Sequence, residues 1–327
     1  MTISGYIDIV METVNIFKAL SDESRLRILS LLQNNELSVN EIVALLGMGQ
    51  SRISRHLKIL ADAGLLSYRK EGLWVFYKME RGGLWGDLYR PVFDRLASGT
   101  FFKNDSMNLR NYLSERTERG REYFNTVAPE WSRIRSSMLG DLDLNSEICS
   151  LVPAGAVIAD LGCGSGELAE RLLVKAGKVI GVDRSPAMLS EARRLLAEKN
   201  ELIDLRLGEL DHLPVRDGEA DSVVISMVLH YLDEQQQAID EASRILKGGG
   251  VLVLAELDSH NNEKMRSVYG HRRLGFSKET VSGWMKKSGF VLKKHKNYKA
   301  GEGLNTVIYT AVKAPAPPEG AKLAKRN

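Results

Sequence analysis

A glycine-rich loop near the middle of the chain has the residue types of a ligand-binding turn. Asp160 begins the run D-L-G-C-G-S-G, which contains Gly162, Gly164 and Gly166. Glycines let a backbone turn sharply and approach a ligand closely. A dinucleotide loop reads G-x-G-x-x-G, but Glu167 occupies the last glycine position of that pattern. A carboxylate there would repel pyrophosphate, while Asp160 can attract an ammonium group, so the loop predicts an S-adenosyl ligand.

Acidic residues after the loop suit the rest of such a ligand. Asp183, seventeen residues after Gly166, can accept hydrogen bonds from both ribose hydroxyls, although it could instead cap the next helix. Glu209 is preferred over Asp211 as the residue that holds the adenine amino group. The full predicted ligand set is Asp160, Gly162, Gly164, Gly166, Asp183, Arg184, Glu209, Leu210 and Ser226.

The elements around this loop alternate between apolar runs and amphipathic stretches. We expect strands at 156–160, 178–183, 202–207, 221–226, 250–256 and 305–312, and helices at 167–176, 186–199 and 234–246. This alternation predicts an α/β Rossmann-like domain with a doubly wound parallel sheet over 154–313. Charged amphipathic helices over 104–153 form the expected connector.

The region before residue 104 has a different chemistry. Between Gln50 and Arg81 seven basic residues face three acidic ones, a local charge of +4. Two helices joined at Gly47-Met48-Gly49 and followed by a basic hairpin predict an α+β winged helix-turn-helix domain over 1–103. Its expected helices are 8–20, 23–33, 39–46, 50–63 and 82–98, with strands 65–70 and 73–79 around a turn at Glu71-Gly72.

The helix that starts at Gln50 has polar and basic residues on one face. Arginine can read guanine in the major groove and glutamine can read adenine, while wing residues contact phosphate or the minor groove. The alternative is an ordinary solvent-exposed charged helix. That alternative is disfavoured because the two helices, the turn between them and the basic hairpin all occur in the order that a winged helix-turn-helix requires. The predicted DNA contacts are Gln50, Ser51, Arg52, Ser54, Arg55, Lys58, Arg69 and Lys70.

Residues 15–80, with F-K-A-L-S-D-E-S-R-L-R-I-L-S-L-L at their start, closely resemble ArsR-type winged-helix repressors. The resemblance implies a homodimer, paired through helices 8–20 and 82–98, that binds an inverted-repeat operator in double-stranded DNA. Metal-sensing members carry cysteines where Ser38 and Asn40 stand here. A soft metal needs thiolates, so we expect no metal.

Residues 120–312 as a set resemble the class I methyltransferases, with Asp221 and L-K-G-G-G at 246–250 completing the pattern. The resemblance implies that the segment Ser226–Tyr231 faces a methyl acceptor. His230 is then a candidate general base, with packing or capping an equal alternative. Tyr123 and Trp131 are candidate lid residues, and ordinary core packing is the alternative.

Two hypotheses describe the function of this fusion. The favoured one is a transcriptional regulator that binds S-adenosylmethionine or S-adenosylhomocysteine as effector, because similar fusions include S-adenosylhomocysteine-responsive regulators of methionine metabolism. The other is an active S-adenosylmethionine-dependent methyltransferase of a small molecule, localised or autoregulated by its DNA-binding domain. The N-P-P-Y signature of DNA amino methylation and the cysteine triplet of arsenite methylation are both missing.

Composition excludes other classes of protein. The 327 residues predict two domains, and no apolar run reaches eighteen residues, so we expect no membrane span. The start of the chain lacks a signal-peptide pattern, and Cys149 and Cys163 are the only cysteines, which indicates a cytoplasmic protein. Residues 314–327, rich in proline and lysine, are expected to be disordered.

Overall fold

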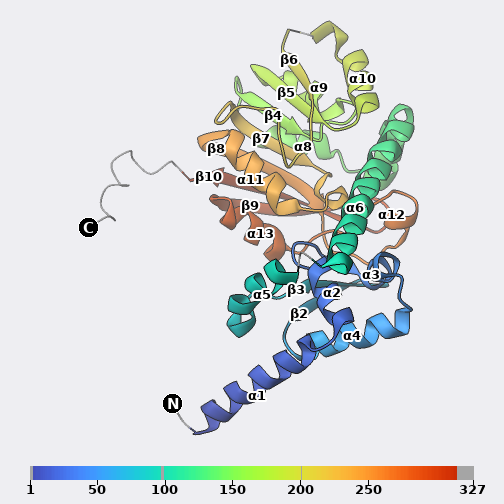
Figure 1. Ribbon diagram of the computed structural model, residues 1–327. Coiled ribbons are helices and arrows are strands. Elements are labelled where there is room, and N and C mark those ends of the chain that lie inside the picture. Colours follow the sequence, from blue (N-terminus) through green and yellow to red (C-terminus); the bar gives the residue numbers. More distant parts are fainter. Residues whose placement is uncertain (1–2, 97–98, 200, 315–327) are drawn as a thin grey trace. The chain divides into compact units, whose positions relative to one another are not determined.

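The computed structural model describes residues 3–96, 99–199 and 201–314, so most of the predicted disordered tail lies outside the described residues. The chain divides into two compact units, Met1–Glu118 and Arg119–Asn327. The division falls within the predicted connector, inside one long helix, α6 (Thr100–Val127). Figure 1 shows the elements of both units, which are described separately below.

The first unit is mainly helical, and its helix ends are set by the predicted signals. Asp22 accepts a hydrogen bond from the Arg25 amide at 3.1 Å and caps the second helix. Ser38 and Glu41 form the predicted capping box, and Gly47 ends that helix with a φ of +64°. The helices are α1 (Ile3–Leu20), α2 (Glu23–Leu31), α3 (Val39–Leu46), α4 (Gln50–Asp62) and α5 (Gly83–Leu96), before α6 begins.

A small antiparallel sheet completes this unit. It consists of β1 (Leu37–Ser38), β2 (Leu66–Glu71) and β3 (Trp74–Met79) in the order β1-β3-β2. The predicted hairpin turn at Glu71-Gly72 is wrong by one residue, because Glu71 pairs with Trp74 and the turn is Gly72-Leu73. Gly72, with a φ of +59°, takes the first turn position, which an L-residue adopts only with strain.

The second unit is built on a seven-stranded sheet. Its order is β6-β5-β4-β7-β8-β10-β9, and β4 to β8 run parallel. The predicted doubly wound parallel sheet is thus confirmed for these five strands, whereas the last strand, β10, pairs antiparallel with both of its neighbours. The strands are β4 (Val157–Leu161), β5 (Lys178–Asp183), β6 (Ile203–Leu207), β7 (Ala220–Ser226), β8 (Leu246–Leu257), β9 (Phe290–Lys299) and β10 (Asn305–Lys313).

Helices cover both faces of this sheet. On one face α11 (Gln235–Ile245) and α13 (Lys278–Lys287) share a core with the strands, and on the other α8 (Leu144–Leu151) and α9 (Glu167–Leu173) do so. The remaining elements are η1 (Ala128–Glu130), α7 (Trp131–Leu139), α10 (Pro186–Leu195), η2 (Ala197–Lys199), η3 (Leu229–Tyr231) and α12 (Lys264–Ser267). This layering brings the carboxyl ends of β4, β5 and β7 to one sheet edge, where ligands of open α/β sheets bind.

Among the helices that the structure describes, none combines the length and the apolar character that crossing a membrane requires.

Candidate functional site

One pocket at the carboxyl edge of the sheet gathers most of the predicted ligand residues. It is partly open to solvent and combines polar, charged and aromatic side chains, as small-molecule sites do. Of the predicted residues, Gly166, Tyr123 and His230 do not line it. The predicted residues that do line it are Asp160, Gly162, Gly164, Asp183, Arg184, Glu209, Leu210, Ser226 and the lid residue Trp131.

The glycine loop has a backbone that other residues could not adopt without strain. Gly162, Gly164 and Gly166 have φ values of +76°, +53° and +87°. A Cβ on Gly162 would lie 2.5 Å from a methyl group of Val228, and one on Gly166 would crowd helix α10. Gly162 and Gly164 therefore shape the wall of the pocket, whereas Gly166 serves the packing of the loop against α10.

Asp183 connects the loop to the next helix. Its carboxylate accepts hydrogen bonds from the amides of Gly164 at 2.9 Å and Ser185 at 2.8 Å. The alternative that Asp183 caps α10 is wrong, because the hydroxyl of Ser185 accepts the Met188 amide as the cap. Burial raises the pKa of Asp183, against the lowering effect of those two amides. A carboxylate has about four acceptor positions, so two remain for ribose hydroxyls.

Asp160 is a buried carboxyl group whose charge Arg135 offsets only in part. Neither of its oxygens has a hydrogen-bond partner in the part of the chain that the structure describes. Burial raises the pKa of Asp160 to about 7, although Arg135 opposes the shift and Asp183 adds to it. An ammonium group in the pocket would satisfy both oxygens and stabilise the charged form. The residues present therefore fit the amino-acid end of an S-adenosyl ligand.

The sequence did not predict Arg135, a positively charged residue of the pocket that could pair with a carboxylate of the ligand. It projects from α7 into the same pocket and donates to Asn145 at 2.6 Å and to Glu167 at 3.5 Å. Burial lowers its pKa, against the opposing effects of Glu167 and Asp160. Arg135 lies one helical turn after Trp131, and this i,i+4 spacing from a predicted lid residue was the available signal. Asp160 and Arg135 together suit an ammonium and a carboxylate on one ligand.

The far end of the pocket is formed by Arg184 and Glu209. Their charged groups lie 4.0 Å apart, and the Arg184 guanidinium lies 6.0 Å from the centre of the Phe124 ring. Burial raises the pKa of Glu209, against the effect of Arg184. Glu209 lines the pocket and Asp211 does not, in agreement with the preference for Glu209 at an adenine amino group.

Aromatic side chains from α6 and α7 form one wall. Phe124 and Trp131 line the pocket and meet at 5.4 Å in a T-shaped arrangement, and Phe124 meets Tyr231 at 4.7 Å. The indole nitrogen of Trp131 lies 3.5 Å from where a Cβ on Gly164 would be. Tyr123 packs near Gly270 behind this wall. The wall thus has Phe124 in the place predicted for Tyr123.

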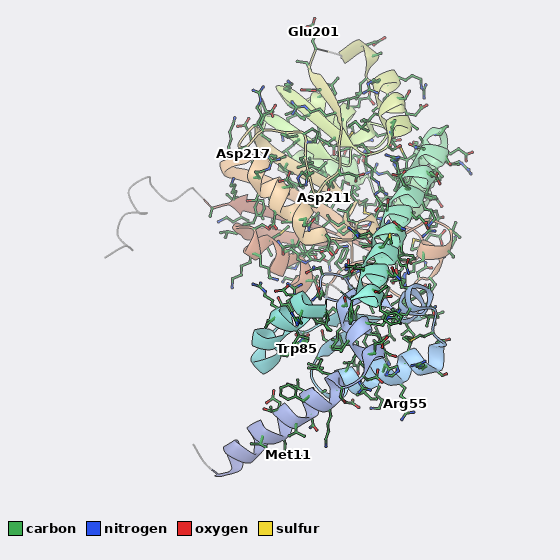
Figure 2. All side chains as sticks on the ribbon, in the orientation of Figure 1. Met11, Arg55, Trp85, Glu201, Asp211 and Asp217 are labelled. Carbon is green, nitrogen blue, oxygen red and sulfur yellow. The ribbon has the colours of Figure 1, made fainter. Side chains whose placement is uncertain are left out.

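The surface of α4 presents the predicted DNA contacts. Gln50, Ser51, Ser54 and Arg55 are exposed, and Figure 2 shows Arg55 on the outward side of the helix. The other predicted contacts have partners within the unit, except Lys70, which is exposed. Arg52 donates to Ser24, Lys58 pairs with Asp62, and Arg69 pairs with Glu36 and Glu71.

Arg69, which the sequence predicts as a DNA contact of the wing, is held by side chains of its own unit. Two of its nitrogens donate to the two carboxylate oxygens of Glu36 at 2.8 and 2.9 Å, and its guanidinium stacks on Phe76 at 4.4 Å. Because Arg69 donates to Glu36 and Glu71, its guanidinium has fewer N–H donors left for a phosphate group. In the described ranges, no set of three or more His, Cys, Asp or Glu residues is arranged to hold a metal ion.

A parallel sheet with a glycine loop and a ribose-type carboxylate at successive strand ends defines a class I methyltransferase fold, here joined to a helix-turn-helix unit. Residues 159–254 match the family model described as a methyltransferase domain. Residues 22–68 match the model of bacterial regulatory proteins of the arsR family. The chain consists of an ArsR-family helix-turn-helix domain, which implies DNA binding, and a class I methyltransferase domain, which implies binding of S-adenosylmethionine.

Relatives agree with this assignment. The arsenite methyltransferase of Halobacterium salinarum is 34% identical over 117 residues, which cover 35% of this chain and 30% of that protein. The demethylmenaquinone methyltransferase of Clavibacter sepedonicus is 28% identical over 174 residues, covering 45% of this chain and 71% of that protein. The match thus spans less than a third of the arsenite methyltransferase.

Among solved structures, the cyclase SpnF superimposes with a TM-score of 0.52 at 17% identity, over 60% of this chain and 95% of that one. At this identity the likeness shows a shared fold.

Proposed function

We propose that the protein is a DNA-binding transcriptional regulator whose methyltransferase domain binds S-adenosylmethionine or S-adenosylhomocysteine as effector. One observation carries the proposal: the single helix α6 holds residues that are fixed in the DNA-binding unit and residues that line the ligand pocket. A ligand regulates DNA binding only if it interacts differently with two states of the protein. A helix shared by both units is a physical route for such coupling.

The first part of α6 is firmly held in the DNA-binding unit. Asp105 is buried and accepts two hydrogen bonds from Arg27, at 2.6 and 2.7 Å. About two and three turns further along, Tyr112 and Arg116 both donate to Glu41, at 3.1 and 2.8 Å. Glu41 is the capping-box residue of α3, the helix before the recognition helix. A displacement of α6 would therefore act directly on the start of α3.

The last part of α6 belongs to the ligand site. Phe124 lines the pocket, and the side-chain oxygen of Asn125 lies 2.7 Å from the hydroxyl of Ser185, the residue that caps α10. Ser185 in turn donates its amide to Asp183, the proposed ribose carboxylate. A ligand that contacts Asp183 and Phe124 would thus favour one position of α6 over others.

An exposed apolar stripe on α1 supports a homodimer. Val10, Met11, Val14 and Phe17 are 41%, 56%, 39% and 56% exposed, and Met11 is labelled in Figure 2. Soluble proteins seldom leave such a contiguous stripe in water, so we infer that a second copy of this chain covers it. A two-fold dimer would present two α4 helices to an inverted-repeat operator in double-stranded DNA.

The proposal is tested by fluorescence anisotropy on a selected operator fragment, with and without saturating S-adenosylhomocysteine or S-adenosylmethionine. We expect at least one ligand to change the Kd for DNA by about 5- to 150-fold. Calorimetry on the same sample establishes that the ligand is bound. Bound ligand with an unchanged Kd would contradict the proposal.

A matched variant separates the two activities. Arg55→Ala should weaken operator binding by about 1–3 kcal/mol if this side chain reads a base, and it should leave ligand binding unaltered. Lys103→Ala, which removes an exposed basic side chain of α6 outside the predicted contact set, is the control and should have a smaller effect.

The alternative function is methyl transfer to a small molecule, and the relatives that are named methyltransferases favour it. The two functions are compatible, because a regulator that binds S-adenosylmethionine can also consume it.

A further inference from the structure

Exposed lysines are concentrated on the last helix of the second unit and on the strand that follows it. Between Lys278 and Lys299 the chain carries seven lysines and one acidic residue, Glu279, a local charge of +6. That charge exceeds the +4 of the segment between Gln50 and Arg81, which predicted the DNA-binding unit. We refer to six of these side chains, all exposed, as the lysine surface: Lys286, Lys287, Lys293, Lys294, Lys296 and Lys299.

The lysine surface belongs to two elements that pack together at one edge of the seven-stranded sheet. Strand β9 is the edge strand, and α13 lies against it (Figure 1). Lys286 and Lys287 occupy the last turn of α13, and Gly289 turns the chain directly into β9. The two helix lysines therefore lie near the first residues of β9, and the other four continue along that strand.

A register shift in β9 affects how its lysines are arranged. Leu292 pairs with Ala311 and Lys294 pairs with Thr310, so Lys293 is inserted between two consecutive pairs. An inserted residue breaks the strict alternation of side chains between the two faces of a strand. At about 3.3 Å per residue, Lys293 and Lys299 are separated by about 20 Å along the strand. The lysine surface is thus an extended row of charges.

Most of these lysines differ from the basic residues of the DNA-binding unit in their lack of partners. Lys296 lies 3.7 Å from Glu147 of α8. In the part of the chain that the structure describes, the ammonium groups of the other five have no ion pair or hydrogen bond. Arg52, Lys58 and Arg69, by contrast, are each held by a residue of the first unit. The lysine surface therefore presents uncompensated positive charge to the solvent.

The length of this row suits an extended polyanion better than a small anion. A single phosphate or carboxylate group cannot reach ammonium groups that are about 20 Å apart. Double-stranded DNA offers one phosphate about every 3.4 Å along each strand. Lysine is a point charge without the planar fork with which arginine reads a guanine base. The lysine surface can therefore hold a phosphate backbone, and it has little means of reading a sequence.

An anionic membrane is another polyanion of sufficient size. Binding at a lipid surface combines basic residues with apolar side chains that enter the boundary of the acyl chains. Within α13 and β9, both of which the structure describes throughout, Val291 is the one large hydrophobic residue that is exposed. The first unit belongs to the ArsR family, which implies that this chain binds DNA. DNA is therefore the partner that the observations favour.

We propose that the lysine surface is a second, sequence-independent contact surface for the phosphate backbone of double-stranded DNA. The proposal rests on the DNA binding of the proposed regulator and adds a contact that lies outside the helix-turn-helix unit. When α4 holds an operator, the rest of the chain is tethered to that duplex, so a weak contact acts at a high effective concentration. Such a contact raises the affinity and its salt dependence without changing the sequence preference.

The test measures binding of the full chain to a random-sequence duplex by fluorescence anisotropy at several salt concentrations. The triple variant Lys293→Gln, Lys294→Gln, Lys299→Gln removes three charges and keeps polar side chains on β9. Each lost phosphate contact changes the slope of log K against log salt by about 0.9, so we expect a slope smaller in magnitude by about 2–3 per chain. Arginine at the same three positions keeps the charges and should keep the wild-type slope.

A matched control removes the same charge from other elements of the second unit. Arg193→Gln, Arg194→Gln and Lys247→Gln together replace three exposed basic residues of α10 and β8. We expect the wild-type slope from this control. An unchanged slope in the β9 variant, or an equal loss in the control, would overturn the proposal.

A second variant covers a failure of the β9 variant to fold. Circular dichroism establishes whether each variant is folded. If the β9 variant is not, Lys286→Gln with Lys287→Gln on α13 decides. We expect this pair to reduce the slope by about 1–2 per chain, and a wild-type slope counts against the lysine surface.

Further measurements separate the possible failures. Flotation with vesicles that contain phosphatidylserine tests the lipid alternative: vesicle binding that needs the lysines, with an unchanged slope on DNA, replaces DNA by a membrane as the partner. Arg55→Ala should lose the preference for operator over random DNA, and the β9 variant should keep it. If bound ligand leaves the Kd for the operator unchanged while the β9 variant shows the smaller slope, the proposed regulation fails and the lysine surface stands. The reverse pair of results rejects only the lysine surface.

Discussion

Two buried aspartates, one in each unit, show how differently the two domains use charge. Asp105 of the DNA-binding unit is 2% exposed, and both of its oxygens accept hydrogen bonds from Arg27. Asp160 of the methyltransferase unit is 1% exposed, and neither of its oxygens has a partner among the described residues. The charge of Asp105 is compensated within the fold. That of Asp160 is offset only in part, by Arg135, and a ligand cation in the pocket would complete the compensation, as the proposed function requires.

The largest expected effect is the loss of the compensated pair. Arg27→Ala leaves Asp105 buried without its counter-ion, which should lower the free energy of unfolding of the first unit by about 3–5 kcal/mol. Chemical denaturation measures it. Lys58→Ala, which breaks an exposed pair with Asp62, is the control and should change stability by about 0.5 kcal/mol or less. Equal losses of unfolding free energy from both substitutions would contradict the view that Arg27 compensates a buried charge on Asp105.

Asp160→Asn, in contrast to Arg27→Ala, should lower ligand affinity and leave stability intact. The free energy of unfolding without ligand should be unchanged or higher, because a costly buried charge is removed. The affinity for S-adenosylhomocysteine should fall by about 10- to 100-fold, the value of a hydrogen bond to a charged group. Calorimetry and denaturation on one preparation test both halves. A variant that loses stability and keeps its affinity would show that Asp160 serves the fold.

Arg135→Gln should separate recognition of the ligand's carboxylate from recognition of its ammonium group. We expect about a tenfold loss of affinity for S-adenosylhomocysteine and little change for the decarboxylated form of S-adenosylmethionine, which lacks the carboxylate that Arg135 is proposed to bind. Competition binding with the two compounds measures the difference. A similar loss for both would mean that Arg135 acts through Asn145 and Glu167 instead.

The pH dependence has a definite sign. The pKa of Asp160 is about 7, above the ordinary value of about 3.9, so the folded chain holds this proton more tightly than the unfolded chain. Its contribution to the free energy of unfolding therefore falls as the pH rises from about 4 to 7, by at most about 1.4 kcal/mol per pH unit. Ligand affinity should rise through the same window. Asp160→Asn removes both slopes, and titrations at several pH values test this.

Local signals explain what the sequence could predict. The capping box at Ser38 and Glu41, the glycine spacing at 162–166 and the carboxylate that ends β5 each depend on residues a few positions apart. The parallel strands β4, β5 and β7 are largely apolar runs, and β6 is a short run that alternates apolar and charged residues. These features required no knowledge of distant contacts.

The missed features depend on contacts across the chain. Arg135 comes from α7, far in the sequence from the strand ends that carry the predicted ligand residues, and only the folded chain brings it into the pocket. The ion pair of Arg69 with Glu36 could not be predicted, because the two residues lie 33 positions apart in the sequence. Strand β9 was not predicted, because its lysines obscure the alternation of apolar and polar residues.

Those same lysines have a consequence for the protein in concentrated solution. Strand β9 is the last strand of the seven-stranded sheet, so one side of its backbone is open to pairing with another molecule. Four exposed lysines stand along it, at positions 293, 294, 296 and 299. Charge on an edge strand opposes edge-to-edge pairing of sheets from different molecules, which is a route to aggregation. A chain with apolar residues at these positions would be expected to precipitate or form fibrils, whatever its affinity for DNA or ligand.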